Sequence, residues 1–397
     1  MATDGDADYS GYTNEQLDEA AHNVDRGRFP LNAQRLLDEQ ERRRTQAAPA
    51  AAAPVQTLTP QFQADGREYF RIWIVNLALT IVTLGIYSAW AKVRKLRYFY
   101  SNTSLAGSAF GYHADPIKIL KGRVIAAVVA VGYFAATRYS VFVTLIVIGL
   151  IAVATPWLVV RSRMFSMRMT SWRGIRFGFR KDYLGAYGAL LGWMALGFVT
   201  FGIMLPYAAC RRYEFIVNRT RFGATAFECH PRAGRFYKTM FAAGGMAFVL
   251  MFVIIFLARW LASALGGVTA SIGGPARIVQ AVVFLAYIPL YAVVHGYTES
   301  RNLNEVFRTT TLGELRLKCQ LRARSLMQIY LTNLLGIVFT LGLYTPWAQL
   351  RLMRYRLAAM AVEVPTTLDA FAAGTEGPAV GAAGEEIGDF LDVDFGF

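Results

Sequence analysis

The stretch that decides the fold reads Thr83-Leu-Gly-Ile-Tyr-Ser-Ala-Trp-Ala-Lys-Val-Arg-Lys-Leu-Arg-Tyr98. It recurs near the end of the chain as Thr340-Leu-Gly-Leu-Tyr-Thr-Pro-Trp-Ala-Gln-Leu-Arg-Leu-Met-Arg-Tyr355. A degenerate copy between them reads Thr200-Phe-Gly-Ile-Met-Leu-Pro-Tyr-Ala-Ala-Cys-Arg-Arg-Tyr213. Each copy begins in apolar sequence and ends in a basic, aromatic stretch. This pattern predicts a repetitive membrane protein whose repeats meet the membrane surface.

The composition is typical of a membrane protein. The chain has 397 residues, 55% of them hydrophobic, and its mean hydropathy is +0.33. The net charge of +14 is unevenly distributed, because residues 61–356 hold 35 basic and nine acidic residues. Such a basic region also suggests nucleic-acid binding. Its bases lie between apolar spans, however, and the preference of Lys and Arg for the cytoplasmic side explains them. We therefore expect no nucleic-acid partner.

Changes in composition divide the chain into four regions: residues 1–45, 46–60, 61–372 and 373–397. The first is a predicted cytoplasmic helical module, which opens with a capping box formed by Thr13 and Gln16. The second is an Ala- and Pro-rich linker, the third is the membrane domain, and the fourth is an acidic tail that we expect to be disordered. The polar start contains no secretory signal. We expect both termini in the cytoplasm, where residues 1–60 offer a site for a protein partner.

Apolar spans predict four membrane crossings. Residues 119–160 divide into two helices at Thr137-Arg-Tyr-Ser140, and residues 239–262 and 276–296 form a second pair. The second pair is joined by an uncharged, glycine-containing segment that we expect to be an external turn. Spans of about 20 apolar residues match the thickness of the hydrocarbon layer. The four spans carry no charge near their centres, which argues against proton- or sodium-coupled transport.

Three further apolar spans carry the repeated motif: residues 72–91, 183–209 and 327–348. If all seven spans crossed from a cytoplasmic amino terminus, residues 92–118 with five bases and residues 161–182 with seven would face outside. That arrangement contradicts the charge rule. If the three spans instead re-enter the membrane or lie in its interface, every basic block is cytoplasmic. We favour this arrangement over full crossing, because the glycine within each motif permits a break in the helix.

Alternation of residue types around small residues predicts short cytoplasmic β-hairpins. They are expected near residues 103–112, 170–179 and 220–229, with fainter copies at 310–317 and 361–368. Upstream of the second and fourth copies stand Thr155-Pro-Trp157 and Ile288-Pro-Leu290. We therefore expect the unit of helix end, arginine and hairpin five times. Because an edge strand exposes unpaired backbone N–H and C=O groups, the hairpins are expected to pair into one sheet.

The candidate site consists of aromatic and basic residues of the repeats. Trp90 and Trp347 share one repeat position, and the arginines that follow each of them lie on one helical face. Two interpretations remain open: a membrane anchor at headgroup depth, or a site for an anionic lipid headgroup or another anion. The residues predicted to contact lipid or anion are Trp90, Arg94, Arg97, Arg161, Arg211, Trp347, Arg351 and Arg354.

Asn76 and Asn333 occupy a second repeat position, inside apolar sequence. We expect them to form hydrogen bonds between helices, with a place on a transport path as the alternative. The chain contains no phosphate-binding loop, nucleophile elbow or spaced set of metal ligands, so we expect no enzymatic activity, cofactor or metal. The leading hypothesis is transport or lipid handling. The alternative is a non-enzymatic membrane scaffold that recruits cytoplasmic partners.

The segment from Glu68-Tyr-Phe-Arg-Ile-Trp-Ile-Val-Asn-Leu77 to Ala114-Asp-Pro-Ile-Lys-Ile-Leu-Lys-Gly-Arg123 resembles the YjgN family of bacterial inner-membrane proteins. The repeated Leu-Gly-Ile-Tyr-x-x-Trp-Ala motif extends the resemblance over residues 61–372. The resemblance implies a multi-pass protein of the bacterial inner membrane, and it brings no assigned activity. The middle copy departs from the motif at Met204, Tyr207 and Glu214. The expected fold is mainly α: a multi-pass transmembrane helical protein with internal pseudo-repeats and short cytoplasmic β-hairpins.

Overall fold

The computed structural model describes residues 4–5, 7–9, 11–47, 56–264 and 275–364. The chain forms two compact units, Met1–Gln56 and Thr57–Phe397. Most of the predicted linker, the turn expected after residue 262 and the acidic tail 373–397 lie outside the described residues.

The first unit is a pair of helices, α1 (Asn14–Asn23) and α2 (Pro30–Ala47). The predicted capping box is confirmed: the Gln16 N–H donates to the Thr13 hydroxyl, and the Thr13 N–H donates to the Gln16 side chain. Leu17 and Leu36 are buried between the two helices. A small local core of this kind follows from the helical spacing of the apolar residues.

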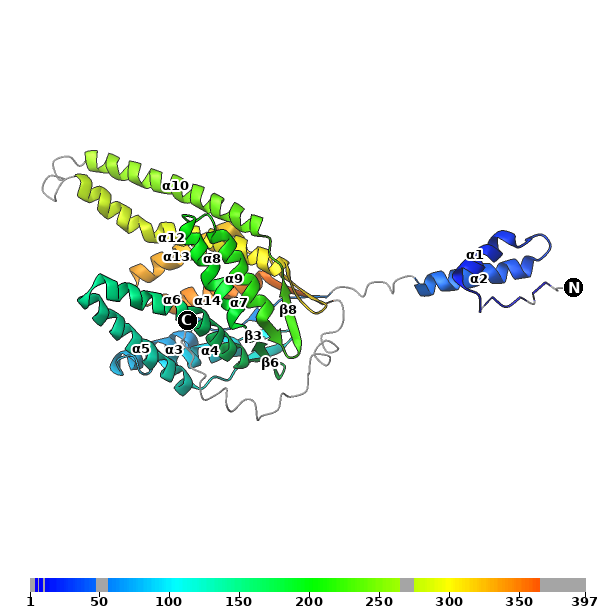
Figure 1. Ribbon diagram of the computed structural model, residues 1–397, viewed down its shortest axis with the longest axis horizontal. Coiled ribbons are helices and arrows are strands. Elements are labelled where there is room, and N and C mark those ends of the chain that lie inside the picture. Colours follow the sequence, from blue (N-terminus) through cyan, green and yellow to red (C-terminus); the bar gives the residue numbers. More distant parts are fainter. Residues whose placement is uncertain (1–3, 6, 10, 48–55, 265–274, 365–397) are drawn as a thin grey trace. The chain divides into compact units, whose positions relative to one another are not determined.

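Within the described residues, the second unit contains five helical pairs (Figure 1). Four pairs consist of two continuous helices each: α3 (Gly66–Val82) with α4 (Ser88–Ser101), α5 (Pro116–Tyr139) with α6 (Val141–Arg168), α10 (Ala233–Ala264) with α12 (Pro275–Arg308), and α13 (Ala323–Phe339) with α14 (Thr345–Ala358). In the remaining pair, which lies between α6 and α10, the first helix is broken into α7 (Tyr183–Ala186), η1 (Tyr187–Gly192) and α8 (Trp193–Val199), and the second is α9 (Leu205–Arg219). The helices α5, α6, α10 and α12 are long and apolar enough to cross a membrane. They coincide with the four predicted crossings.

The three spans that carry the repeated motif do not continue as single helices. Each first helix ends before the motif threonine, and the two residues after that threonine have positive φ. Leu84 and Gly85 have φ of 49° and 92°, and the pairs Phe201–Gly202 and Leu341–Gly342 repeat the same conformation. The Thr83 hydroxyl accepts a hydrogen bond of 2.9 Å from the Tyr87 N–H, which fixes the start of the next helix. The chain therefore turns back at the motif, as the favoured arrangement requires.

The segments between the helical pairs form strands, and these join into one sheet. Within the described residues the strands are β1 (Gln56–Leu58), β2 (Gln61–Phe62), β3 (Thr103–Leu105), β4 (Ser108–Tyr112), β5 (Thr170–Trp172), β6 (Ile175–Phe179), β7 (Thr220–Phe222), β8 (Thr225–Cys229), β9 (Thr310–Leu312), β10 (Leu315–Cys319) and β11 (Met360–Val364). The sheet order is β1-β11-β10-β9-β8-β7-β6-β5-β4-β3-β2. The hairpins expected near 103–112, 170–179, 220–229 and 310–317 are therefore present. Of the copy expected at 361–368, β11 is a single strand and residues 365–368 lie outside the described residues. The expectation of separate short hairpins was incomplete, because these strands are parts of one eleven-stranded sheet.

One rule of connection governs the whole unit. The strand before each helical pair and the strand after it are antiparallel neighbours: β2 with β3, β4 with β5, β6 with β7, β8 with β9 and β10 with β11. Both ends of every helical pair therefore reach the same sheet. Because strands of one sheet cannot lie on opposite sides of a membrane, the alternative in which all seven apolar spans cross is wrong.

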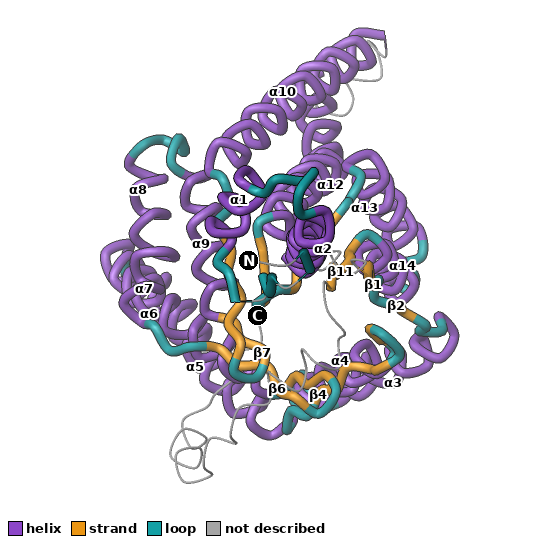
Figure 2. The backbone as a smooth tube through the Cα atoms, turned by 90° about the vertical axis from the view of Figure 1, so that its right-hand side faces the viewer, coloured by secondary structure: helices purple, strands orange, loops and turns teal. Residues whose placement is uncertain are grey.

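The sheet and the helices both close on themselves. The edge strands β1 and β2 are separated only by Thr59 and Pro60, so the curled sheet brings its two edges together. Pro60 has no N–H to offer to a neighbouring strand. Among the helices, α14 packs against α3 and joins the last pair to the first. The five pairs thus form a helical ring above the curled sheet (Figure 2).

The two faces of the sheet differ in chemistry. In β10, Leu315 and Cys319 are buried, whereas Arg316 and Lys318 are exposed. The inward faces of several strands form one core, which includes Trp172, Phe222 and Leu312 with Leu315. This alternation of period two is the reason that the hairpins were predictable from sequence.

The motif turn generates a prediction about its glycine. Gly342 has a φ of 93° and Gly244 is an interior residue of α10, and an added Cβ would meet no atom within 4 Å at either position. We expect Gly342→Ala to cost about 1–2 kcal/mol, because an L-residue is strained at positive φ. Gly244→Ala should be neutral or stabilising. Apparent melting temperatures in detergent measure both effects; equal melting temperatures for the two variants would contradict the left-handed turn.

Candidate functional site: a ring of aromatic and arginine pairs

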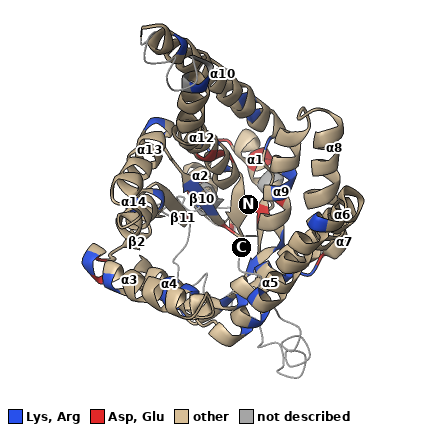
Figure 3. Ribbon diagram, turned by 90° about the vertical axis from the view of Figure 1, so that its left-hand side faces the viewer, with Lys and Arg blue, Asp and Glu red and all other residues tan. Residues whose placement is uncertain are grey.

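The second helix of each pair ends in the same way. Thirteen residues before the first residue of the following strand stands an aromatic residue, and an arginine follows it four residues later. The five couples are Trp90–Arg94, Trp157–Arg161, Tyr207–Arg211, Tyr297–Arg301 and Trp347–Arg351. A spacing of four places both side chains on one helical face. Lys and Arg, blue in Figure 3, occur on helices around the ring.

Three of these couples form cation–π contacts. The guanidinium carbon lies 5.6 Å from the ring centroid for Arg161 over Trp157, 5.0 Å for Arg211 over Tyr207 and 5.6 Å for Arg301 over Tyr297. Such contacts hold the cation against the indole or phenol face. The aromatic residue therefore positions the arginine beside it.

The fourth couple, Tyr297 and Arg301, was missed by sequence reasoning. The proline of Ile288-Pro-Leu290 matches the proline of Thr155-Pro-Trp157, so the fourth copy was placed at Pro289. In the structure Pro289 lies inside α12, eight residues before Tyr297. The spacing of thirteen residues before Thr310, the first residue of β9, identifies Tyr297 and hence the couple Tyr297–Arg301, whereas matching the prolines does not.

Two of the predicted lipid-contacting arginines join neighbouring helical pairs. Arg97 donates to the Ala114 carbonyl at 3.2 Å, and Arg354 donates to the Ala64 carbonyl at 3.2 Å. Each acceptor alanine precedes the aspartate that caps the first helix of the next pair. These arginines therefore link the second helix of one pair to the beginning of the next, and a headgroup contact by either remains a prediction.

The other predicted arginines differ in their partners. Arg211 donates to the Tyr207 hydroxyl at 2.9 Å and pairs with Glu214 at 2.6 Å. Arg351 donates to the Thr332 hydroxyl at 2.8 Å. In the described part of the chain, the Arg161 Nε has no hydrogen-bond partner. Arg94 is exposed.

The two tryptophans pack against neighbouring elements. Trp347 is stacked on Phe70 of α3, with ring centroids 4.9 Å apart. Trp90 is half-buried and packs against the core cluster that contains Ile119 and Phe165. Trp347 therefore takes part in closing the helical ring, whereas Trp90 packs the first helical pair against the second.

Asn76 and Asn333 are both buried, and their environments differ. The Asn333 Nδ2 donates to the Ala348 carbonyl at 3.1 Å, so it links α13 to α14. The Asn76 Oδ1 is buried and, within the described residues, has no hydrogen-bond partner. The expected hydrogen bond between helices is therefore present for Asn333, whereas the Asn76 oxygen is left unsatisfied.

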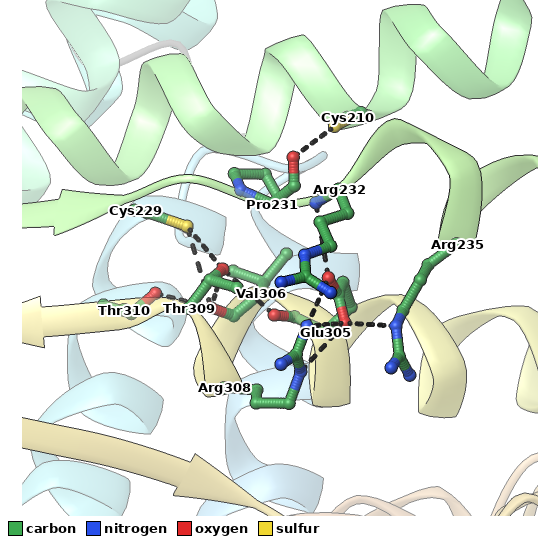
Figure 4. Close-up of polar contacts among 10 residues, drawn as sticks. All are labelled: Cys210, Cys229, Pro231, Arg232, Arg235, Glu305, Val306, Arg308, Thr309 and Thr310. Carbon is green, nitrogen blue, oxygen red and sulfur yellow. Dashed lines mark hydrogen bonds and ion pairs between the residues drawn. The ribbon is translucent and has the colours of Figure 1, made fainter.

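A basic pocket of about 570 Å³ lies where α10 begins and α12 approaches the sheet. Its lining includes Arg232, Arg235, Lys238 and Arg301. The pocket is supported by Glu305, which is only 3% exposed. Glu305 accepts from the Arg232 backbone N–H at 3.3 Å and pairs with Arg235 at 3.2 Å and Arg308 at 2.9 Å (Figure 4). One carboxylate therefore anchors the first turn of α10 to α12.

This anchor predicts a loss of stability for Glu305→Gln. The substitution removes the charge that Arg235 and Arg308 share, and hydrogen bonds to charged groups contribute about 1.5–3 kcal/mol each. We expect the apparent melting temperature in detergent to fall. Glu314→Gln changes the charge equally at an exposed position in the turn after β9 and should leave it unchanged. Equal melting temperatures for the two variants would contradict an anchoring role for Glu305.

Comparison with known proteins places the chain in a family. Residues 57–390 match the family model described as "Bacterial protein of unknown function (DUF898)". Two relatives named "Inner membrane protein YjgN" are each 32% identical: one from Salmonella typhimurium over 148 residues, 36% of this chain and 37% of the relative, and one from Escherichia coli K12 over 130 residues, 31% of each. These alignments span about a third of the relatives' lengths. No solved structure matches the chain. The resemblance to YjgN is thus confirmed, and this membrane protein belongs to the DUF898 family of bacterial proteins of unknown function.

Proposed function

We propose that this chain is a multi-pass inner-membrane protein, built from five copies of one unit, that binds anionic phospholipid headgroups where its helical pairs meet the sheet. This proposal corresponds to the lipid-handling part of the leading hypothesis from the sequence. The observation that carries it is the basic pocket between α10 and α12, because those two helices are among the four that are apolar enough to cross a membrane.

Exposed apolar side chains support membrane insertion of the helical pairs. At the three motif turns, Leu84 is 94% exposed, Phe201 98% and Leu341 95%. Large apolar residues at the exposed end of a hairpin are unfavourable in water and favourable in hydrocarbon. A helix of the length of α3 extends about 25 Å, which is less than the roughly 30 Å of the hydrocarbon layer. The three short pairs therefore suit re-entrant hairpins, and the two long pairs suit complete crossings.

The distribution of charge supports a cytoplasmic sheet. The helical pairs all leave from one sheet, so the basic residues near it lie on one side of the membrane. Lys and Arg concentrate on the cytoplasmic side of inner-membrane proteins. With an even number of crossings and all strands on that side, both termini are cytoplasmic in this proposal.

The pocket has the charge that an anionic headgroup requires. Four cations, Arg232, Arg235, Lys238 and Arg301, line it, and among them Arg235 is paired with the Glu305 carboxylate. The excess of positive charge favours a phosphate, which accepts several hydrogen bonds from arginine and lysine. The aromatic residue Tyr297 holds Arg301 in place. Each basic residue near an anionic leaflet contributes about 1 kcal/mol of attraction.

A triple substitution tests the proposed headgroup site. Arg232→Gln, Lys238→Gln and Arg301→Gln together remove three cations and leave the pair of Arg235 with Glu305 intact. At about 1 kcal/mol each, their loss should weaken phosphatidylglycerol binding on the order of 100-fold. Native mass spectrometry of the full chain during lipid titration measures the affinity, and phosphatidylcholine serves as the zwitterionic reference lipid.

The matched control makes the same change of charge on the outer face of the sheet. Arg176→Gln, Arg221→Gln and Arg316→Gln lie on β6, β7 and β10, away from the pocket lining. The control should retain wild-type affinity. Equal losses in the two triple variants, or no loss in the first, would contradict a localised headgroup site.

A further inference from the structure

A cavity of about 550 Å³ lies between the inward face of the curled sheet and the helix ends above it. Its walls are almost wholly apolar and come from strands around the sheet, including Leu105, Phe110, Phe177, Phe227, Leu317 and Val362. A volume of this size is in the range of sites that hold small-molecule ligands. Apolar cavities stay dry and take up apolar ligands, so the walls favour a hydrocarbon occupant.

One side chain in the lining breaks the pattern. Among the described residues that line the cavity, Lys95 of α4 is the only charged one. Its ammonium lies 5.8 Å from the centroid of the Phe99 ring. Among the described residues, no ion pair joins Lys95 to a carboxylate. Burial lowers the pKa of this ammonium. A half-buried cation without a carboxylate partner is stabilised by a bound anion.

Lys95 also borders a second, polar cavity of about 340 Å³ between α3 and α4. Lys92, Arg123 and Asn76 contribute to the lining of this cavity. Asn76, whose buried Oδ1 has no hydrogen-bond partner within the described residues, is one of these lining residues. A buried amide oxygen without a donor calls for a polar group that the protein does not itself supply.

We infer that the two cavities together bind a single-chain anionic amphiphile, with its hydrocarbon chain inside the curled sheet and its anionic head at Lys95. The apolar walls exclude the head, and the cation at their border selects a negative one. A head that also carries a hydroxyl donates to the Asn76 Oδ1. A fatty carboxylate and an anionic lysophospholipid share the chain and the negative charge, and they differ in this hydroxyl. The site is separate from the headgroup pocket at α10, so the two proposals stand independently.

Quenching of tryptophan fluorescence tests this inference, because Trp172 lies in the cavity wall. The full chain in phosphatidylcholine nanodiscs is titrated with dibrominated stearate, whose bromines quench a tryptophan they contact. We expect a saturable component of quenching that is absent from the Trp172→Phe variant, which separates it from quenching of the chain's other tryptophans. The neutral dibrominated stearyl alcohol should require about tenfold more ligand for half-saturation, as expected for loss of one charge-assisted contact.

Variants at Lys95 locate the anionic head. Lys95→Met should weaken the carboxylate about tenfold and leave the alcohol unchanged, whereas Lys95→Arg should retain the affinity. Lys181→Met, an exposed lysine outside both cavities, is the matched control. Absence of a saturable Trp172 component, or equal affinity for carboxylate and alcohol in the unmodified chain, would overturn the inference even if Lys95→Met fails to fold.

Two further arms identify the source of the ligand and separate the two proposals. A brominated lysophosphatidylglycerol that binds more tightly than the carboxylate, and that Asn76→Leu weakens selectively, would assign the polar cavity to a phosphoglycerol head. Tighter binding of the carboxylate would assign the site to a fatty acid. The triple variant at Arg232, Lys238 and Arg301 should leave cavity binding unchanged, and a comparable loss there would contradict an independent site.

Discussion

Hydrogen bonding between the strands on either side of each helical pair is the constraint on which the rest of the structure depends. The strand that follows each helical pair is hydrogen-bonded to the strand that precedes the same pair. Tight turns with positive φ, such as Arg173–Gly174, join one such couple to the next. The result is a continuous antiparallel sheet that holds both ends of every helical pair at one level. The helical ring, the level of the arginines and the cavity within the sheet all follow from it.

Two chemically different sites arise from this arrangement. At the sheet ends of the helices, aromatic residues hold arginines beside the emerging apolar surfaces, and the pocket supported by Glu305 concentrates several cations there. Inside the sheet, inward apolar side chains meet across the curl and leave a cavity with Lys95 at its border. In our proposals a lipid headgroup binds at the first site and a hydrocarbon chain at the second, so both sites serve the handling of lipids and amphiphiles.

Local sequence patterns made the helices and hairpins predictable. The closure of the sheet and of the helical ring was not predictable from such patterns. The strands that begin at Thr103, Thr170 and Thr220 alternate around small turn residues, which is a signal within a few positions. By contrast, β1 is a three-residue strand at the end of an Ala- and Pro-rich segment, and its partner β11 lies near the other end of the chain. In the sequence Lys95 is one of several basic residues between Lys92 and Arg97. Only the curled sheet places it beside an apolar cavity, so sequence reasoning could not single it out.

The central claim is that all strands lie on one side of the membrane, in the cytoplasm, and single cysteines at equivalent outward positions test it most directly. Ala109→Cys, Arg176→Cys, Ala226→Cys and Arg316→Cys place one thiol on each of β4, β6, β8 and β10, all at exposed positions, while the native Cys210, Cys229 and Cys319 are buried. A membrane-impermeant maleimide should label all four in inverted inner-membrane vesicles and none in intact spheroplasts. Labelling of any one of them in spheroplasts would contradict the single cytoplasmic sheet.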